Sequence, residues 1–108
     1  MQTIQRNDLV ALIDLGDRLV LIEALPETYY RKGHLPGAIH LPHDQVRRGA
    51  AGLPEDKSAP IVVYCASATC KNSHVAAKAL SDLGYTDVRV YLEGKKDWQD
   101  AGLPLVEA

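Results

Sequence analysis

The strongest constraint on the fold comes from residues 60–84, which read PIVVYCASATCKNSHVAAKALSDLG. The first six residues form a continuous apolar run, which is too short for a surface helix and typical of a strand buried on both faces. A loop of small residues follows, and a buried strand that leads through a loop into a helix favours a parallel sheet with helices on both faces. We expect the apolar face of that helix to consist of Val75, Ala76, Ala79, Leu80 and Leu83.

The same alternation of strands and helices continues through the chain. Continuous apolar runs predict strands at 19–24, 38–41, 60–65 and 87–92. Caps and helical spacing predict helices at 6–16, 26–33, 72–84 and 95–102, with a weaker pattern at 44–53. The first helix has Asn7 as its expected N-cap and Gly16 at its expected end. We therefore predict one α/β domain over residues 1–108, with a central parallel sheet of about five strands.

The composition argues against several functions. A chain of 108 residues that is 46% hydrophobic and 24% charged is ordinary for one globular domain. The net charge of −2 gives no electrostatic basis for binding nucleic acid or an anionic membrane. No apolar run is long enough to span a membrane, and the start MQTIQRNDLV lacks a basic-then-apolar signal. We therefore expect a cytoplasmic protein without nucleic-acid or membrane partners, whose two cysteines are kept as thiols.

Cys65 ends the buried strand, at the edge of the sheet where parallel α/β proteins bind their ligands. The residues after it, Ala66, Ser67, Ala68 and Thr69, are small, so the backbone can wrap closely around an anion. Amides of such a loop and of a helix N-terminus stabilise a thiolate and lower the pKa of a thiol below its free value of about 8.5. This pattern indicates a nucleophilic cysteine, and the alternative is a buried cysteine that packs as a small apolar residue.

Five segments carry a resemblance to a known family: LIEA at 21–24, GHLPGAIHLP at 33–42, IVVYC at 61–65, AAKALSDLGY at 76–85 and GKKDWQDAGLPL at 94–105. In this order and spacing they resemble the single-domain rhodaneses, which are sulfurtransferases. The resemblance implies that Cys65 accepts a sulfane sulfur from thiosulfate, a persulfide or a polysulfide and becomes a persulfide. A small thiol, a protein thiol or cyanide then takes the sulfur, in two-step covalent catalysis without a cofactor.

Several positions depart from the pattern of that family. Cys70 stands where many rhodaneses have an arginine, and Ala68 stands where many have a glycine. Glu-Ala-Leu at 23–25 replaces a common Asp-Val-Arg, so a second cation is missing. These losses weaken the case for thiosulfate, because a bidentate guanidinium is the natural clamp for an anion. Lys71 could supply one charge without that geometry, and the amides of residues 66–71 would be the main ligands of the sulfur.

Cys65 and Cys70 form a C-x4-C pair within one loop. Cys70 could attack the Cys65 persulfide and leave a disulfide, pass the sulfur onward, protect Cys65 from over-oxidation, or be a spectator. Two other functions therefore stay open: a thiol-disulfide or persulfide reductase that uses the pair, and a non-catalytic rhodanese-like module that binds partners or senses sulfide. A phosphatase or arsenate reductase is disfavoured, because the related C-x5-R pattern has lysine here at position 71.

The remaining candidate residues have structural explanations. The spacing C-x4-C-x3-H, which ends at His74, matches no closed zinc site, so we predict no metal. His34 is expected to be a turn histidine that is hydrogen-bonded to the backbone. Trp98 is expected to pack beneath the last helix together with the leucines that follow it. Lys95 and Lys96 are expected to be solvated residues at the start of that helix.

Overall fold

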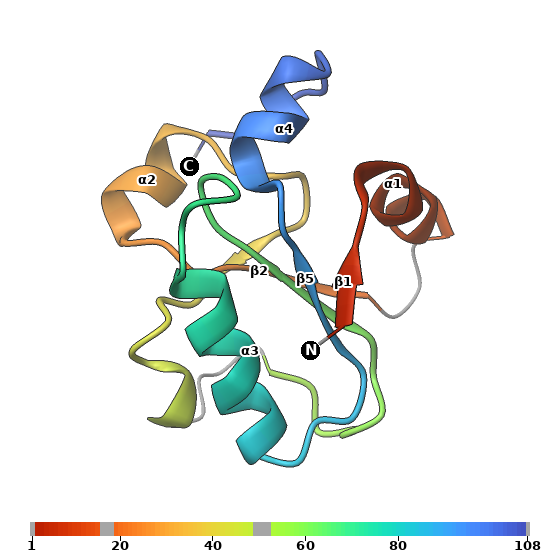
Figure 1. Cartoon of the computed structure of the whole chain (residues 1–108), viewed down its shortest axis with the longest axis vertical. Coiled ribbons are helices and arrows are strands. Elements are labelled where there is room, and N and C mark those ends of the chain that lie inside the picture. The colour runs from red at the N-terminus through yellow and green to blue at the C-terminus, as the bar shows by residue number, and fades with distance from the viewer. Residues whose placement is uncertain (1, 16–18, 49–52, 108) are drawn as a thin grey trace.

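The computed structural model of the chain describes residues 2–15, 19–48 and 53–107. Strands and helices alternate along most of its length (Figure 1). None of the helices in these three ranges is long and apolar enough to cross a membrane. In chain order the elements are β1 Gln2–Ile4, α1 Arg6–Leu15, β2 Val20–Glu23, α2 Glu27–Lys32, β3 Ile39–His40, the 3-10 turn η1 Val46–Arg48, β4 Ile61–Tyr64, α3 Asn72–Asp82, β5 Val88–Tyr91 and α4 Gly94–Asp100.

The strands form one parallel sheet of five strands in the order β1-β5-β4-β2-β3. The central strand β4 pairs with β2 on one side and with β5 on the other, so that Tyr64 lies opposite both Glu23 and Tyr91. Every residue of β4 is buried, which explains why its sequence is apolar without alternation. The predicted α/β fold with a central parallel sheet of about five strands is confirmed.

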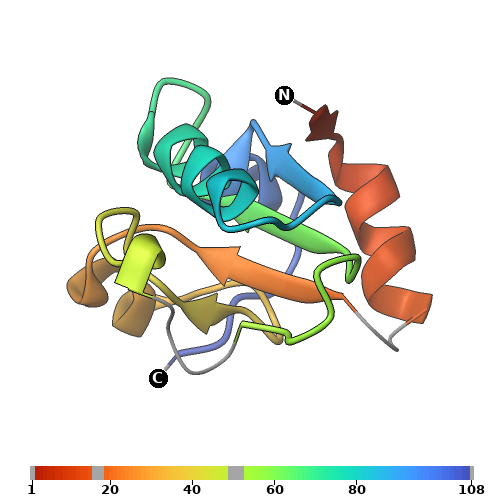
Figure 2. The same cartoon turned by 90° about the horizontal axis from the view of Figure 1, so that it is seen from below.

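Side chains of β4 alternate between two apolar layers, because successive residues of a strand point to opposite faces of the sheet. Ile61 and Val63 belong to the layer beneath α3 and η1. Val62 and Tyr64 belong to the other layer, which includes Leu9 of α1 and Trp98 of α4. Accordingly, α3 and α1 lie on opposite sides of the strands (Figures 1 and 2). The helices therefore cover both faces, as predicted.

The segments that follow the strands converge at one edge of the sheet. Because the strands are parallel, the carboxyl ends of β2, β4 and β5 all point to this edge. The amide of Ala24, just after β2, donates to the carbonyl of Tyr64 at 3.0 Å. The amide of Lys95, in α4, donates to the carbonyl of Cys65 at 2.9 Å. The fold thus gathers three connecting segments around the beginning of the cysteine loop.

The start of the chain differs from the sequence-based expectation. Gln2–Ile4 forms the edge strand β1, which pairs in parallel with β5 and which was not predicted. The helix begins at Arg6, so Asn7 lies within its first turn and the predicted N-cap is wrong. The predicted end of this helix, Gly16, lies outside the described residues.

Two further helix predictions need correction. Within the predicted helix at 44–53 only the 3-10 turn η1 forms, while residues 49–52 lie outside the described part of the chain. In α3, Val75 is 49% exposed, so its assignment to the apolar face is wrong. The buried stripe of α3 is instead rotated toward Ser73 and Ala77, which are both buried. This rotation brings Ser73 toward the cysteine loop.

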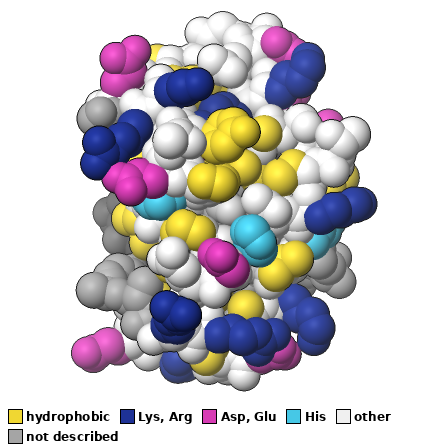
Figure 3. Space-filling model, turned by 90° about the vertical axis from the view of Figure 1, so that its left-hand side faces the viewer, with side chains coloured by type: hydrophobic (Ala, Val, Ile, Leu, Met, Phe, Trp, Pro, Cys, Tyr) yellow, Lys and Arg dark blue, Asp and Glu magenta, His cyan; other side chains and the backbone are white. Residues whose placement is uncertain are grey.

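The surface over α2 and α3 is of mixed character (Figure 3). Apolar side chains gather in the upper half of this face, and basic and acidic side chains are interspersed around them. Two of the large exposed apolar residues are Tyr29 of α2 and Val75 of α3. This face is therefore not a uniformly basic surface of the kind that binds nucleic acid.

We predict that Trp98→Ala lowers the free energy of unfolding by about 3–5 kcal/mol, because a large buried side chain is lost and a cavity remains. Trp98 is 4% exposed, and its Nε1 donates to the carbonyl of Pro104 at 2.8 Å. The control Val75→Ala should change the same free energy by less than about 0.5 kcal/mol. Urea unfolding followed by circular dichroism measures both variants, and effects of equal size would contradict this description of the core.

Candidate active site

Cys65 lies immediately after the central strand β4, and residues 66–71 join it to α3. The residue is 1% exposed. Its sulfur donates a hydrogen bond to Oγ of Ser73 at 3.4 Å. Ser73 is itself buried, in the first turn of α3. The sulfur therefore rests beneath the loop and against the first turn of the following helix, rather than in an open pocket.

Burial raises the pKa of the Cys65 thiol above its ordinary value, because a buried thiolate loses its hydration. A hydrogen bond with the side chain of Cys70 raises this pKa further, whereas the hydroxyl and amide of Ser73 lower it. The net direction contradicts the sequence-based expectation of a lowered pKa. Ser73 at the start of the helix does supply donors, but the loss of solvent outweighs them.

The first turn of α4 fixes two peptide groups of the cysteine loop. The amides of Lys95 and Lys96 donate to the carbonyls of Cys65 and Ala66, both at 2.9 Å. In a planar trans peptide the carbonyl and the following N–H point in opposite directions. The amides of Ala66 and Ser67 therefore point away from α4. In this way the last helix determines on which side the loop presents these two donors.

Most of the amides that were predicted to hold the sulfur are free. Within the described ranges, the amides of Ala66–Thr69 and of Lys71 donate to no other group of the protein. The amide of Cys70 differs, since it donates to the carbonyl of Ser67 at 3.1 Å and closes a turn. Lys71 is exposed, at the position just before α3. The loop therefore keeps unused donors of the kind that bind an anionic sulfur.

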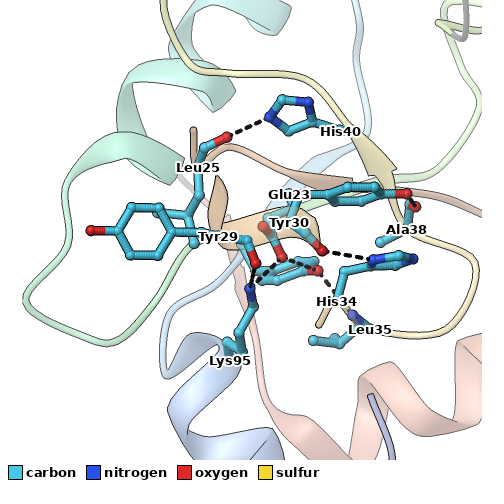
Figure 4. Close-up of polar contacts among 10 residues, drawn as sticks. Glu23, Leu25, Tyr29, Tyr30, His34, Leu35, Ala38, His40 and Lys95 are labelled. Carbon is cyan, nitrogen blue, oxygen red and sulfur yellow. Dashed lines mark hydrogen bonds and ion pairs between the residues drawn. The ribbon is translucent and has the colours of Figure 1, made fainter. Parts of the chain in front are cut away.

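A buried ion pair that was not predicted from the sequence lies at the same edge of the sheet (Figure 4). Glu23, at the end of β2, is fully buried and pairs with Nζ of Lys95 at 2.9 Å. The Lys95 side chain is only 13% exposed and also donates to the carbonyl of Tyr29 at 3.1 Å. The expectation that Lys95 is solvated is therefore wrong. Its neighbour Lys96 is exposed as expected and pairs with Asp100.

Tyr64 connects this ion pair to the central strand. Its hydroxyl donates to Oε1 of Glu23 at 2.8 Å and accepts a hydrogen bond from the amide of Leu35 at 3.0 Å. Burial and the charge of Glu23 raise the pKa of Tyr64, so that the phenol stays protonated and remains a donor. The second carboxylate oxygen of Glu23, Oε2, has no hydrogen-bond partner among the described residues. Compensation of this buried charge thus depends on Lys95 and Tyr64.

An aromatic and histidine cluster holds the segment that follows β2 (Figure 4). The rings of Tyr30 and His34 stack with centroids 3.8 Å apart. Nδ1–H of His34 donates to the Tyr30 carbonyl at 3.1 Å, which confirms the predicted backbone-bonded turn histidine. The Tyr30 hydroxyl donates to the carbonyl of Ala38, and Nε2–H of His40 donates to the carbonyl of Leu25, both at 2.7 Å. These contacts explain His34 and His40 as structural residues.

The structure brings together Cys65, Cys70 and the loop between them, and it adds Ser73, which sequence reasoning missed. Its position at the start of a helix, eight residues after Cys65, was the available signal. Over residues 2–15, 19–48 and 53–107, no group of three or more His, Cys, Asp or Glu side chains is placed to hold a metal ion.

Comparison with known proteins gives the family. Residues 5–101 match the family described as "Rhodanese-like domain". The chain therefore belongs to the rhodanese-like domain family, and the resemblance seen in the sequence is confirmed.

Two relatives and one solved structure illustrate the similarity. The chain is 33% identical over 104 residues to the HTH-type transcriptional regulator Rv0324 of Mycobacterium tuberculosis, a match that covers 96% of this chain but only 44% of that protein. It is 32% identical over 83 residues to the thiosulfate sulfurtransferase PspE of Escherichia coli, covering 77% of this chain and 73% of that one. The human single-domain sulfurtransferase TSTD1 has the same fold, with a TM-score of 0.80 at 20% identity, covering 93% of this chain and 96% of that one.

We predict that alkylation of Cys65 by iodoacetamide accelerates with pH and has its inflection above the range of a free cysteine, because the thiolate reacts and burial raises its pKa. Below the inflection the rate should rise about tenfold per pH unit. Ser73→Ala should move the inflection upward and Cys70→Ser should move it downward, since these residues lower and raise the pKa respectively. Peptide mass spectrometry resolves the two cysteines, and an inflection below that of free cysteine would contradict this account.

We predict that Gly94→Ala displaces the cysteine loop. Gly94 has φ +69°, and a Cβ there would lie 2.5 Å from the carbonyl oxygen of Cys65 and 2.9 Å from the amide nitrogen of Ser67. Gly84→Ala is the matched control, because Gly84 has φ +100° and no neighbouring atom within 4 Å of such a Cβ.

Both substitutions place a side chain on left-handed backbone, which costs about 1–2 kcal/mol. Only Gly94→Ala should also accelerate the reaction of Cys65, by about tenfold or more, because a displaced loop leaves the sulfur less buried, which opens access to it and lowers its pKa. Urea unfolding and the alkylation rate of Cys65 measure the two effects. Equal behaviour of the two variants in both measurements would show that α4 does not set the loop.

Proposed function

We propose that this protein is a sulfurtransferase that carries a sulfane sulfur as a persulfide on Cys65. The proposal depends on one observation: Cys65 begins a loop with free backbone amides, at the carboxyl end of the central strand. Membership of the rhodanese-like family supports it. So does the similarity to PspE, a protein named as a thiosulfate sulfurtransferase.

The transfer takes place in two displacement steps. The Cys65 thiolate attacks the outer sulfur of a persulfide, a polysulfide or thiosulfate, and the donor leaves as a thiolate, a shortened polysulfide or sulfite. A thiolate or cyanide then attacks the outer sulfur of the Cys65 persulfide, and the Cys65 thiolate leaves. Each step exchanges one bond to sulfur for another, so neither step requires an external oxidant or reductant. The free amides of residues 66–69 and 71 stabilise the negative charge on the outer sulfur.

The burial of Cys65 constrains the first of these steps. Since the residue is 1% exposed, the loop has to move aside before a donor can reach its sulfur. The second step is less restricted, because an S–S bond of about 2.05 Å places the outer sulfur of the persulfide farther from the strand. Ala68 and Thr69, at the tip of the loop, are exposed. Sulfur that is bound to Cys65 is therefore closer to solvent than the thiol that receives it.

The donor that best fits this site is a persulfide or a polysulfide. Leu25 and Cys70 stand where many rhodaneses have arginine, and Lys95 is held in its ion pair with Glu23. Thiosulfate carries two negative charges and binds best to a bidentate guanidinium. Lys71 is exposed and offers a single point charge instead. We therefore infer a preference for persulfide or polysulfide donors over thiosulfate.

A second candidate function uses both cysteines, and it is supported by the influence of the Cys70 side chain on the Cys65 thiol, whose pKa it raises. In this reaction the Cys70 thiolate attacks Sγ of Cys65 in the persulfide, hydrosulfide leaves, and a Cys65–Cys70 disulfide forms. A dithiol reductant must then reduce that disulfide before the next cycle. Such a protein would be a persulfide reductase, in which sulfur carriage is one stage of the cycle.

Intact mass after incubation with thiosulfate, glutathione persulfide or polysulfide separates the candidates. We predict a gain of one sulfur atom that is largest with glutathione persulfide and is absent in Cys65→Ser, because Cys65 is the acceptor. A loss of two hydrogens in the unmodified protein, absent in Cys70→Ser, would support the reductase. If no donor changes the mass, both enzymatic functions are wrong and a non-catalytic rhodanese-like module remains.

A further inference from the structure

We propose that Glu23 and Lys95 are a positioning pair, which holds the first turn of α4 against the cysteine loop and so fixes the direction of the loop amides. Among the described residues, the two side chains make polar contacts with each other, with Tyr64 and with Tyr29, and not with the sulfur of Cys65. The inference rests on the proposed function only in taking Cys65 as the reacting group.

Lys95 binds the two sides of the site with different atoms. Its Nζ reaches Glu23 at the end of β2, and its backbone amide donates to the carbonyl of Cys65. Glu23 is paired in register with Tyr64, the residue directly before Cys65. The ends of β2 and β4 and the start of α4 therefore form a closed ring of contacts around the first residue of the loop.

The backbone of α4 lies directly against the loop, as the absence of a side chain at Gly94 shows. A Cβ there would lie 3.0 Å or closer to three backbone atoms of residues 65–67. No flexible side chain lies between the two segments at this point, so a shift of the helix start is transmitted to the loop. The carbonyls of Cys65 and Ala66 would turn with it, and the amides in the same peptide planes would turn as well.

The energetics of buried charge allow positioning to be separated from stability. A buried ion pair is often no more stabilising than an apolar pair of similar size, whereas removal of one partner leaves an uncompensated charge. An uncompensated charge would be especially costly at Glu23. Its side chain is fully buried, and its Oε2 has no hydrogen-bond partner among the described residues. An ion pair with hydrogen bonds does fix direction, which an apolar pair does not. Loss of both charges should therefore restore stability without restoring the geometry of the loop.

The experiment compares Glu23→Gln, Lys95→Met and the double variant. Urea midpoints should fall in both single variants and recover toward the parent value in the double variant. In all three, Cys65 alkylation by iodoacetamide at neutral pH, normalised to the plateau of each variant at high pH, should rise about three- to tenfold, because a loop that is no longer held in place buries the thiol less and burial is the main cause that raises its pKa. Glu23→Gln is nearly isosteric and decides the question if Lys95→Met does not fold.

Two further variants are controls. Lys95→Arg keeps the charge and can donate to both oxygens of Glu23, so its normalised rate should stay within about twofold of the parent protein. Lys78→Met removes an exposed lysine, with a side chain 73% exposed, from an ion pair with Asp82. This substitution should leave the pH profile of Cys65 unchanged.

Two results would overturn the inference. Unchanged profiles in the single variants would show that the pair does not act on the loop. Recovery of both the midpoint and the profile in the double variant would show that the pair serves folding alone. Alkylation requires no sulfur donor, so these outcomes are read independently of the mass experiment. A parent protein that gains no sulfur would remove the proposed function and leave the positioning measurement intact.

Discussion

The site depends above all on the two hydrogen bonds that the first turn of α4 makes with the carbonyls of Cys65 and Ala66. They join the last helix of the chain to the loop that follows the central strand. Gly94 permits this contact, because a larger residue would meet the backbone of the loop. The parallel sheet places the two segments at one edge, but these bonds decide how the peptide groups of the loop are turned. Backbone geometry, rather than a set of polar side chains, therefore defines the surroundings of the thiol.

Much of the fold could be predicted because its central unit is encoded locally. The apolar run of β4 and the helical spacing of α3 are both readable within about 25 residues, and each implies its neighbour. Gln2–Ile4 gave no such signal, since three residues with only Ile4 buried have no period to detect. Val75 was misplaced for a different reason. Its apolar character fits the stripe, but the packing of α3 turns the buried face toward Ser73.

In the candidate site, likewise, only the part that is contiguous in sequence could be predicted. Cys65 and its loop follow one another in sequence, so their juxtaposition needs no knowledge of the fold. The ion pair of Glu23 and Lys95 joins residues that only the sheet topology brings together, and spacing along the chain cannot reveal it. The direction of the pKa shift of Cys65 was also inaccessible. It depends on how much solvent the loop excludes and on where the side chain of Cys70 lies, and both are properties of the packed structure.

The buried charges of Glu23 and Lys95 also restrict how this sequence can diverge. Loss of the lysine first would leave a buried carboxylate without its partner. Loss of the glutamate first would leave a mostly buried ammonium group without its partner. A substitution at either position alone is therefore disfavoured, unless the other position changes as well or the protein remains folded with one unpaired charge. The two sites should therefore be inherited as a unit, with charge present at both or at neither.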